Sequence, residues 1–254
     1  MRIIKPGLWG AVALSLVGWF AATGIARATG TIVPLYSDPS EPPWSAIISA
    51  KNSHPTVPVI AVINAGDPGG PGPAVDPQYT SGIADLQAAG ITVVGYVATG
   101  NALRPEGDIQ GEVRTWKLFY PSITGIFFDE MSNDPGDVAF YQHQDSYART
   151  QGFTYTVGNP GTETDPSYVG VVNTLLVYES SGVPTSSLPS WYASYAPTNF
   201  GVIPYNVPNL NANATSFIAT ARQTIGYIYL TNDDLDNPWD TLSSYFSGLL
   251  DQLQ

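Results

Sequence analysis

The sequence predicts a single α/β domain, a (β/α)8 TIM barrel, on three observations. After residue 28, eight short apolar runs alternate with segments of helical periodicity, the order of elements typical of a parallel sheet covered by helices. No linker divides this part of the chain, and it contains no internal repeat. The alternative is a doubly wound open sheet, which usually has fewer strands, and the G-x-G-x-x-G turn common in that fold is absent.

The predicted elements follow from apolar runs for strands and from amphipathic spacing for helices. The strands are expected at residues 31–36, 58–64, 92–99, 125–129, 154–159, 174–179, 201–205 and 225–230. The helices are expected at residues 44–51, 78–89, 108–119, 138–151, 211–222 and 239–250. The segments after the fifth and sixth strands are short and poorly periodic, so no helix is assigned to them.

Composition limits the classes of function. Hydrophobic residues make up 43% and charged residues 12% of the chain, which is typical of a globular protein. The absence of cysteine excludes disulfides, thiol nucleophiles and thiolate metal sites. The net charge of −12 would repel phosphate backbones, so we expect no nucleic-acid partner and favour a neutral or cationic one.

The N-terminal 28 residues have the pattern of a secretory signal peptide. Arg2 and Lys5 precede an apolar run over 8–26, and Ala26-Arg27-Ala28 is a small-x-small cleavage pattern. Residues 29–254 would then form the mature domain, secreted to the extracellular space or cell wall. An uncleaved membrane anchor is the alternative, and the only basis for membrane association. The sequon Asn213-Ala214-Thr215 is compatible with either secretory route.

Three carboxylates lie at the predicted ends of two apolar strands. Asp129 and Glu130 end the fourth strand, and Glu179 ends the sixth. Because adjacent strand residues point to opposite faces, only one of Asp129 and Glu130 can face inward. In a barrel, the carboxyl ends of the strands hold the chemistry, and two carboxylates are the minimum equipment for glycoside hydrolysis.

Other polar and aromatic residues at the strand ends suit a sugar, because amides and acids hydrogen-bond hydroxyl groups while aromatic rings stack on pyranose faces. The candidate substrate contacts are Tyr36, Asn64, Asp67, Tyr96, Asn159, Tyr229 and Asp233. Each has a structural alternative: the tyrosines could fill the barrel, and Asp67 and Asp233 could hold turns or caps.

The two histidines do not support a metal or triad site. His54 falls in a loop and His143 within a predicted helix, away from the strand ends. We therefore expect no metal and no cofactor. A carboxylate-only metal site formed by Asp129, Glu130 and Glu179 is the remaining alternative.

Nine short motifs follow one another along the chain. They are Pro34-Leu35-Tyr36, Pro43-Trp44, Val62-Ile63-Asn64, Asp67-Pro68-Gly69-Gly70, Gly95-Tyr96-Val97-Ala98-Thr99, Gly125-Ile126-Phe127-Phe128-Asp129-Glu130, Val177-Tyr178-Glu179, Asn237-Pro238-Trp239-Asp240 and Ser244-Tyr245-Phe246. In this order and spacing the chain resembles the spherulin-4 family of fungal and bacterial glycoside hydrolases. The resemblance implies a (β/α)8 enzyme, endo-acting on α-1,4-linked galactosamine or N-acetylgalactosamine in galactosaminogalactan, an exopolysaccharide of fungal cell walls and biofilms. The family's acidic positions fall on Asp129, Glu130 and Glu179.

We expect Asp129 to be the nucleophile and Glu179, with a raised pKa, the general acid and base of a retaining reaction. Exchanging the roles of Asp129 and Glu130 is the second choice, and Glu130 could instead orient its neighbours or bind an amino group. We expect a monomer. A non-catalytic carbohydrate-binding barrel and a structural spore or cell-wall protein are the alternatives to an enzyme.

Overall fold

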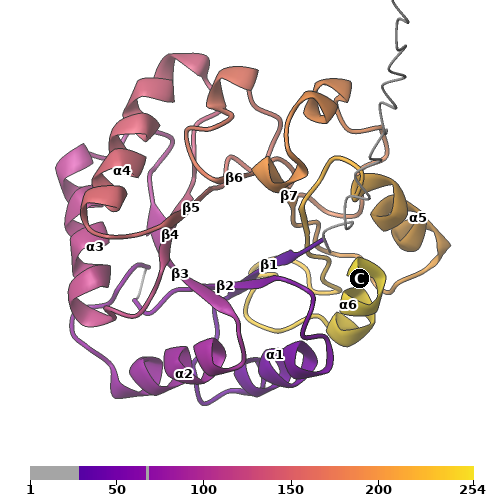
Figure 1. Ribbon diagram of the computed structural model, residues 1–254, viewed down its shortest axis with the longest axis horizontal. Helices are drawn as coiled ribbons and strands as arrows, with labels where there is room; N and C mark the ends of the chain where they lie inside the picture. Colours follow the sequence, from indigo (N-terminus) through magenta and orange to yellow (C-terminus); the bar gives the residue numbers. More distant parts are fainter. Residues whose placement is uncertain (1–28, 67–68) are drawn as a thin grey trace, which may run out of the picture.

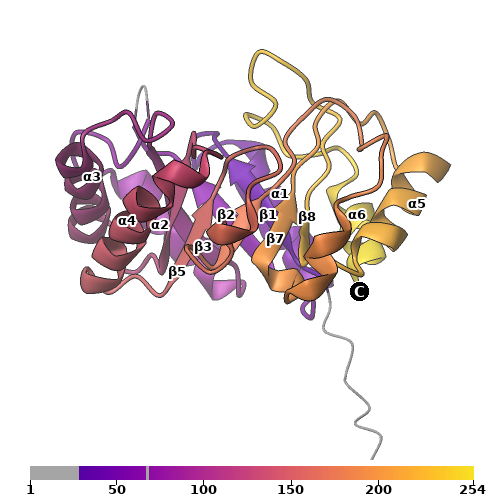
Figure 2. The same cartoon turned by 90° about the horizontal axis from the view of Figure 1, so that it is seen from above.

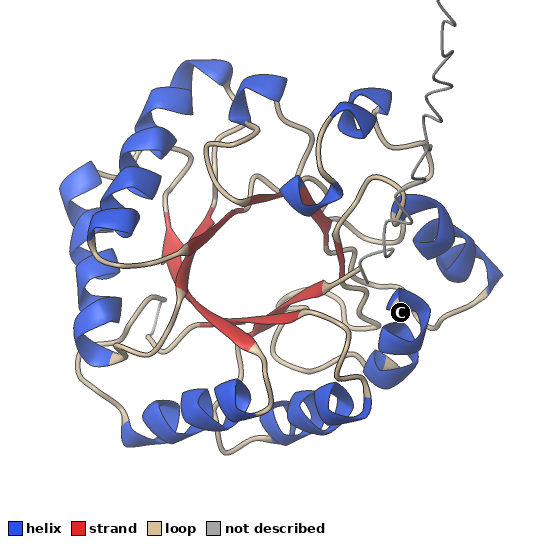
Figure 3. Cartoon of the chain, in the orientation of Figure 1, coloured by secondary structure: helices blue, strands red, loops and turns tan. Residues whose placement is uncertain are grey.

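The computed structural model describes residues 29–66 and 69–254, which form one eight-stranded parallel barrel inside a ring of helices (Figures 1 and 3). The strands follow chain order, from β1 to β8, around the barrel. The N–H of Gly30 donates to Gly226 O at 2.8 Å, and Ile228 N–H donates to Gly30 O at 2.9 Å, so the last strand joins the first. The predicted (β/α)8 fold is confirmed. The predicted signal peptide and Asp67 lie outside the described residues.

The strands are β1 Thr31–Leu35, β2 Val59–Ile63, β3 Thr92–Ala98, β4 Gly125–Asp129, β5 Tyr155–Gly158, β6 Thr174–Leu176, β7 Phe200–Val202 and β8 Tyr227–Ile228. The α-helices are α1 Pro42–Ser53, α2 Pro77–Ala88, α3 Glu106–Phe119, α4 Val138–Thr150, α5 Ala212–Ala221 and α6 Phe246–Leu253. Short 3-10 helices are η1 Pro135–Asp137, η2 Pro166–Tyr168, η3 Ser190–Ser194 and η4 Pro197–Asn199.

The first half of the barrel is regular because its strands are continuous apolar runs buried on both faces. Helix α2 begins where Asp76 accepts a hydrogen bond from Gln78 N–H, with proline in its first turn. Helix α3 packs on β3 through Trp116, whose indole donates to Tyr96 O at 2.7 Å. A Cβ at Gly95 would lie 2.5 Å from the Trp116 ring, so this close packing of helix on strand requires glycine.

The second half has short strands and irregular connections. No α-helix follows β5 or β6, as expected, and only the short helices η2, η3 and η4 occupy those segments. Several predicted boundaries were wrong. The sixth strand ends at Leu176 instead of 179, and the seventh ends at Val202 instead of 205. The eighth strand covers Tyr227–Ile228 instead of 225–230, and the last helix covers Phe246–Leu253 instead of 239–250. The backbone of Trp239 is used elsewhere, since its carbonyl accepts from Tyr36 N–H at 3.1 Å beyond the end of β1.

The loops that follow the strands rise from one end of the barrel, and the loop between β8 and α6 is prominent among them (Figure 2). This end is the mouth at the carboxyl ends of the strands, where barrel enzymes hold their active sites. In the described part of the chain, no helix is long and apolar enough to cross a membrane.

Candidate active site

Asp129 and Glu179 are brought together at the mouth by one amide. The Nδ2 atom of Asn159 donates to Asp129 Oδ1 at 2.8 Å and to Glu179 Oε2 at 2.6 Å. Because both oxygens share this nitrogen, they can be no more than about 5.4 Å apart, within the range for two carboxyl groups that act without an intervening water. The predicted carboxylate pair therefore exists, and its bridge is a residue that had been expected to contact substrate.

The backbone fixes all three residues of this cluster. Asp129 is the last residue of β4, and Asn159 comes directly after β5, where its N–H donates to Phe128 O at 2.8 Å. The N–H of Glu179 donates to Gly161 O at 2.9 Å. Three neighbouring segments of the mouth thus converge on one point.

Gly161 also sets the orientation of the bridging amide. Its N–H donates to Asn159 Oδ1 at 3.1 Å, which directs Nδ2 toward the two acids. Gly161 has φ +64°, and a Cβ there would lie 3.4 Å from the Glu179 Cβ and 3.5 Å from Oε2. The left-handed backbone and the close approach both favour glycine at this position.

The environment of Glu179 favours its protonated form. Burial is the main cause, and the nearby Asp129 charge adds to it; hydrogen bonds from Asn159 and from the Trp239 indole oppose them. The net effect raises the pKa of Glu179 from 4.5 to about 7. A carboxyl group with this pKa can donate a proton near neutral pH and take one back afterwards.

Three hydrogen bonds favour the ionised form of Asp129. Burial raises the pKa of Asp129, whereas hydrogen bonds from Asn159, the Glu130 N–H and the Tyr96 hydroxyl oppose that rise. Hydrogen bonds to a carboxylate favour ionisation. Burial thus raises the pKa of both acids, and Asn159 donates to the ionised form of each.

Tyrosine rings line the mouth beside the acids. Tyr36 and Tyr96 meet edge to face with ring centroids 5.6 Å apart, and Tyr96 stacks on the buried Phe127. Burial and the Asp129 charge raise the pKa of both tyrosine hydroxyls, so they stay protonated as donors. Both residues therefore lie beside Asp129, and their contact with substrate stays a prediction.

Glu130 points to a different part of the mouth. It is exposed and adopts a left-handed backbone with φ of 50°, and its Oε2 accepts from Gly100 N–H at 3.1 Å. Its own carbonyl accepts from Thr99 and Asn101. Glu130 therefore holds the β3–α3 loop, and Asp129 is the acid that shares a donor with Glu179.

Three other predicted contacts have structural partners. Asn64 Oδ1 accepts from Gly70 N–H at 2.7 Å and holds the loop after β2. Tyr229 is fully buried, and its hydroxyl accepts from Ser243 N–H at 3.2 Å, so the structure places it inside the barrel wall instead of in the mouth. Asp233 accepts from the Thr241 hydroxyl at 2.5 Å and organises the loop between β8 and α6.

Trp239 is a site residue that the sequence reasoning assigned to a helix. It is buried, packs edge to face on Tyr205, and lies close enough to Glu179 for its indole to lower the pKa of that carboxyl. No local signal marks Trp239 as a site residue, because a proline directly before it is compatible with the first turn of a helix, as at Pro42 and Pro77.

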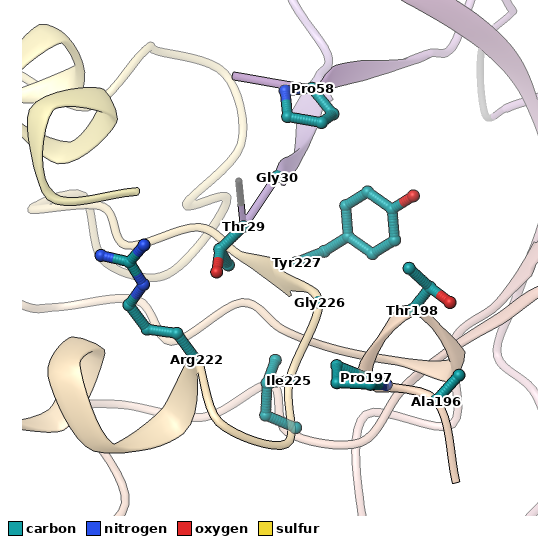
Figure 4. Close-up of a pocket in the computed structure, with 10 residues that line it drawn as sticks. All are labelled: Thr29, Gly30, Pro58, Ala196, Pro197, Thr198, Arg222, Ile225, Gly226 and Tyr227. Carbon is teal, nitrogen blue, oxygen red and sulfur yellow. The ribbon is translucent and has the colours of Figure 1, made fainter. Parts of the chain in front are cut away.

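A cavity of about 340 Å³ lies at the opposite end of the barrel, between the start of β1 and the segments before β7 and β8 (Figure 4). No carboxylate lines it; its lining includes Thr29, Pro58, Thr198, Arg222 and Tyr227. In the described residues, no group of three or more histidine, cysteine or acidic side chains is arranged to hold a metal ion.

Comparison with known proteins identifies the family. The family model "Spherulation-specific family 4" matches residues 30–253. The chain belongs to this family. Spherulin-4 of Physarum polycephalum is 29% identical over 231 residues, which cover 85% of this chain and 67% of that protein. The crystal structure of Aspergillus clavatus Sph3 in complex with GalNAc superposes with a TM-score of 0.77 at 22% identity, covering 89% of this chain and 98% of that one. The spherulin-4 resemblance is thus confirmed, and the solved structure supports the barrel.

Proposed function

We propose that this member of the spherulation-specific family is a secreted glycoside hydrolase that uses Asp129 and Glu179 as its catalytic pair. The observation that carries the proposal is the Asn159 bridge, which holds two desolvated carboxylates side by side at the barrel mouth. Burying two acids next to each other is costly, and the cost is expected where the pair does chemistry.

The proposed substrate is a polysaccharide of α-1,4-linked galactosamine and N-acetylgalactosamine, cut within the chain. Family membership supports this class, as does the GalNAc bound to the similarly folded Aspergillus Sph3. The net charge of −12 would attract a partly deacetylated, cationic polymer. Tyr36 and Tyr96 offer ring edges for the sugar beside the acids, and the Tyr36 hydroxyl can donate to it.

In the proposed mechanism, Glu179 protonates the glycosidic oxygen while the Asp129 carboxylate attacks the anomeric carbon. The bond to the leaving sugar breaks as a bond from C1 to Asp129 forms, giving a covalent glycosyl-enzyme. Glu179, now ionised, takes a proton from water as that water attacks C1, and Asp129 leaves. Asn159 keeps the two carboxylates at the same separation throughout the reaction.

The distance between the acids supports retention of configuration. Retaining enzymes place the carboxyl groups about 5–5.5 Å apart, whereas inverting enzymes leave roughly 6.5–9.5 Å for a water. The shared donor limits the Asp129 and Glu179 oxygens to about 5.4 Å, which favours the retaining arrangement.

The test is release of reducing ends from purified galactosaminogalactan by residues 29–254, beside folded Asp129→Asn and Glu179→Gln variants. We expect release by the parent and loss in both variants. A parent protein that binds the glycan but releases nothing would overturn the enzyme and favour the carbohydrate-binding alternative.

A further inference from the structure

The sequon residue Asn213 lines a groove that includes none of the residues of the catalytic cluster. We propose that Asn213 carries an N-linked glycan whose first sugars lie in a groove between α5 and residues 184–193. The inference rests on the secretion included in the proposed function, because N-glycans are added to chains in the secretory pathway.

The first turn of α5 leaves the Asn213 side chain available. Asn211 caps the helix, and its Oδ1 accepts from the N–H groups of Asn213 and Ala214 at 2.9 and 3.0 Å. Asn213 is exposed, and its side-chain amide has no hydrogen-bond partner among residues 29–66 and 69–254. The amide is therefore not needed for capping, and a glycan on it would disturb no contact of the fold.

A groove of about 440 Å³ begins at this residue. One side of it is a single face of α5, where residues three and four apart are neighbours, and the other side is the segment that leads into η3. Its lining combines hydroxyl and amide groups with apolar surface, and includes Ser187, Leu188, Ser190, Ser216, Phe217 and Thr220.

This lining matches the chemistry of N-acetylglucosamine, the sugar that is joined to asparagine. Phe217 is four residues after Asn213, one helical turn along the same face, and is only partly buried. Its ring and Leu188 across the groove provide apolar surface for the C–H face of a sugar, while the serine and threonine hydroxyls can bond its polar groups. No charged side chain lines the groove, as suits a neutral glycan.

The modification is a substitution at the glycan's first carbon. The Asn213 Nδ2 atom displaces the diphosphate of a lipid-linked oligosaccharide, so that a C1–N bond forms and the C1–O bond to phosphate breaks. The amide proton is lost and the lipid diphosphate leaves, with no oxidation or reduction. None of Asp129, Asn159, Glu179, Tyr36 or Tyr96 lines the groove, so glycan and catalytic site are independent.

The site is tested by secreting residues 29–254 from yeast behind a host leader and measuring intact mass before and after enzymatic glycan removal. We expect a glycan on the parent and on Thr215→Ser, which keeps the consensus, and none on Asn213→Gln or Thr215→Ala. A secreted parent with unmodified Asn213 would overturn the assignment. Glycanase activity is assayed on the same proteins, so that its absence from a glycosylated parent would count against the proposed function alone.

The groove is tested with four proteins: the parent and Phe217→Ala, each made in yeast and, without glycan, in bacteria. We expect the glycan to raise the Tm of the parent by about 2 °C, through its contact with the ring, and to raise that of Phe217→Ala by clearly less. Equal shifts in the two pairs would place the glycan outside the groove.

Discussion

The two ends of the barrel differ in the kinds of polar group that line them. The cavity at the end where the strands begin is lined by glycine, proline and threonine, with Arg222 as its cation, and Arg222 donates to Gln252 O at 2.8 Å. The mouth at the other end buries two carboxylates that share the Asn159 amide. A cavity alone does not locate chemistry; desolvated acids held close together by designated donors do.

The comparison also separates stability from function. A buried acid with a raised pKa lowers stability at neutral pH, whereas the cavity at the opposite end has no acid in its lining. Substitutions at the mouth should therefore remove activity and can raise stability, and substitutions at the opposite end should do neither strongly.

The largest effect is expected for Asp129→Asn at the mouth. Loss of the nucleophile should lower kcat by at least about 10³-fold, because an amide cannot form the glycosyl-enzyme. The measurement is the rate of reducing-end release, with folding checked by circular dichroism. Glu130→Gln serves as the matched control and should retain far more activity; a control as inactive as Asp129→Asn would exchange the roles of the two acids.

Asn159→Ala tests whether the amide that bridges the two carboxylates is needed for catalysis. Removing the shared donor frees both carboxylates and should lower kcat by about 10²-fold, the size of effect seen when one preorganised donor is lost. The pKa that governs the basic limb of kcat/KM should rise as well, because Asn159 lowers the pKa of Glu179. A full pH–rate profile measures both, and an unchanged limb would contradict the bridge.

The stability of the parent should fall as pH rises, and Glu179 is the reason. Its pKa is about 7 in the folded protein against 4.5 for an unperturbed glutamate, so the folded state binds more protons between these values. The free energy of unfolding should drop by about 3 kcal/mol across this window relative to Glu179→Gln. Urea unfolding at pH 4.5 and pH 8 gives the difference, and parallel pH curves for the two proteins would show that Glu179 is not desolvated.

The smallest effect is expected at the opposite end. Arg222→Ala removes two exposed hydrogen bonds, to Gln252 O and Gln254 O, and should change the free energy of unfolding by about 1 kcal/mol with kcat unchanged. Thermal unfolding and the reducing-end assay measure the two quantities. A tenfold loss of kcat would mean that the two ends are coupled.

The strands in the regular half of the barrel were predictable because each one is a continuous apolar run that can be recognised from its own residues. The run Gly125–Asp129 is apolar up to its last residue, and that residue is the acid in the mouth. In the second half, β8 has only two residues, and Tyr229 beyond it is buried by Trp239 and Phe246 from the following segment. No local pattern encodes such contacts between distant segments.

The sequence predicted which residues form the candidate site, but not the hydrogen bonds that connect them. Strand ends identified Asp129, Glu179 and Asn159 as neighbours, since parallel strands end at one edge. That Asn159 bridges the acids depends on Gly161 N–H, which holds the other atom of the amide. Trp239 reaches Glu179 only because the chain after β8 folds back over the mouth, a tertiary arrangement that periodicity does not reveal.

The most direct test of the central claim, a nucleophile and an acid held close enough to react without an intervening water, is the configuration of the first product. Proton NMR during early cleavage of an α-linked galactosamine oligosaccharide distinguishes the two anomers before they interconvert. The shared Asn159 donor and the short gap that it sets predict the α-anomer. Initial release of the β-anomer would contradict the assignment of Asp129 as the nucleophile.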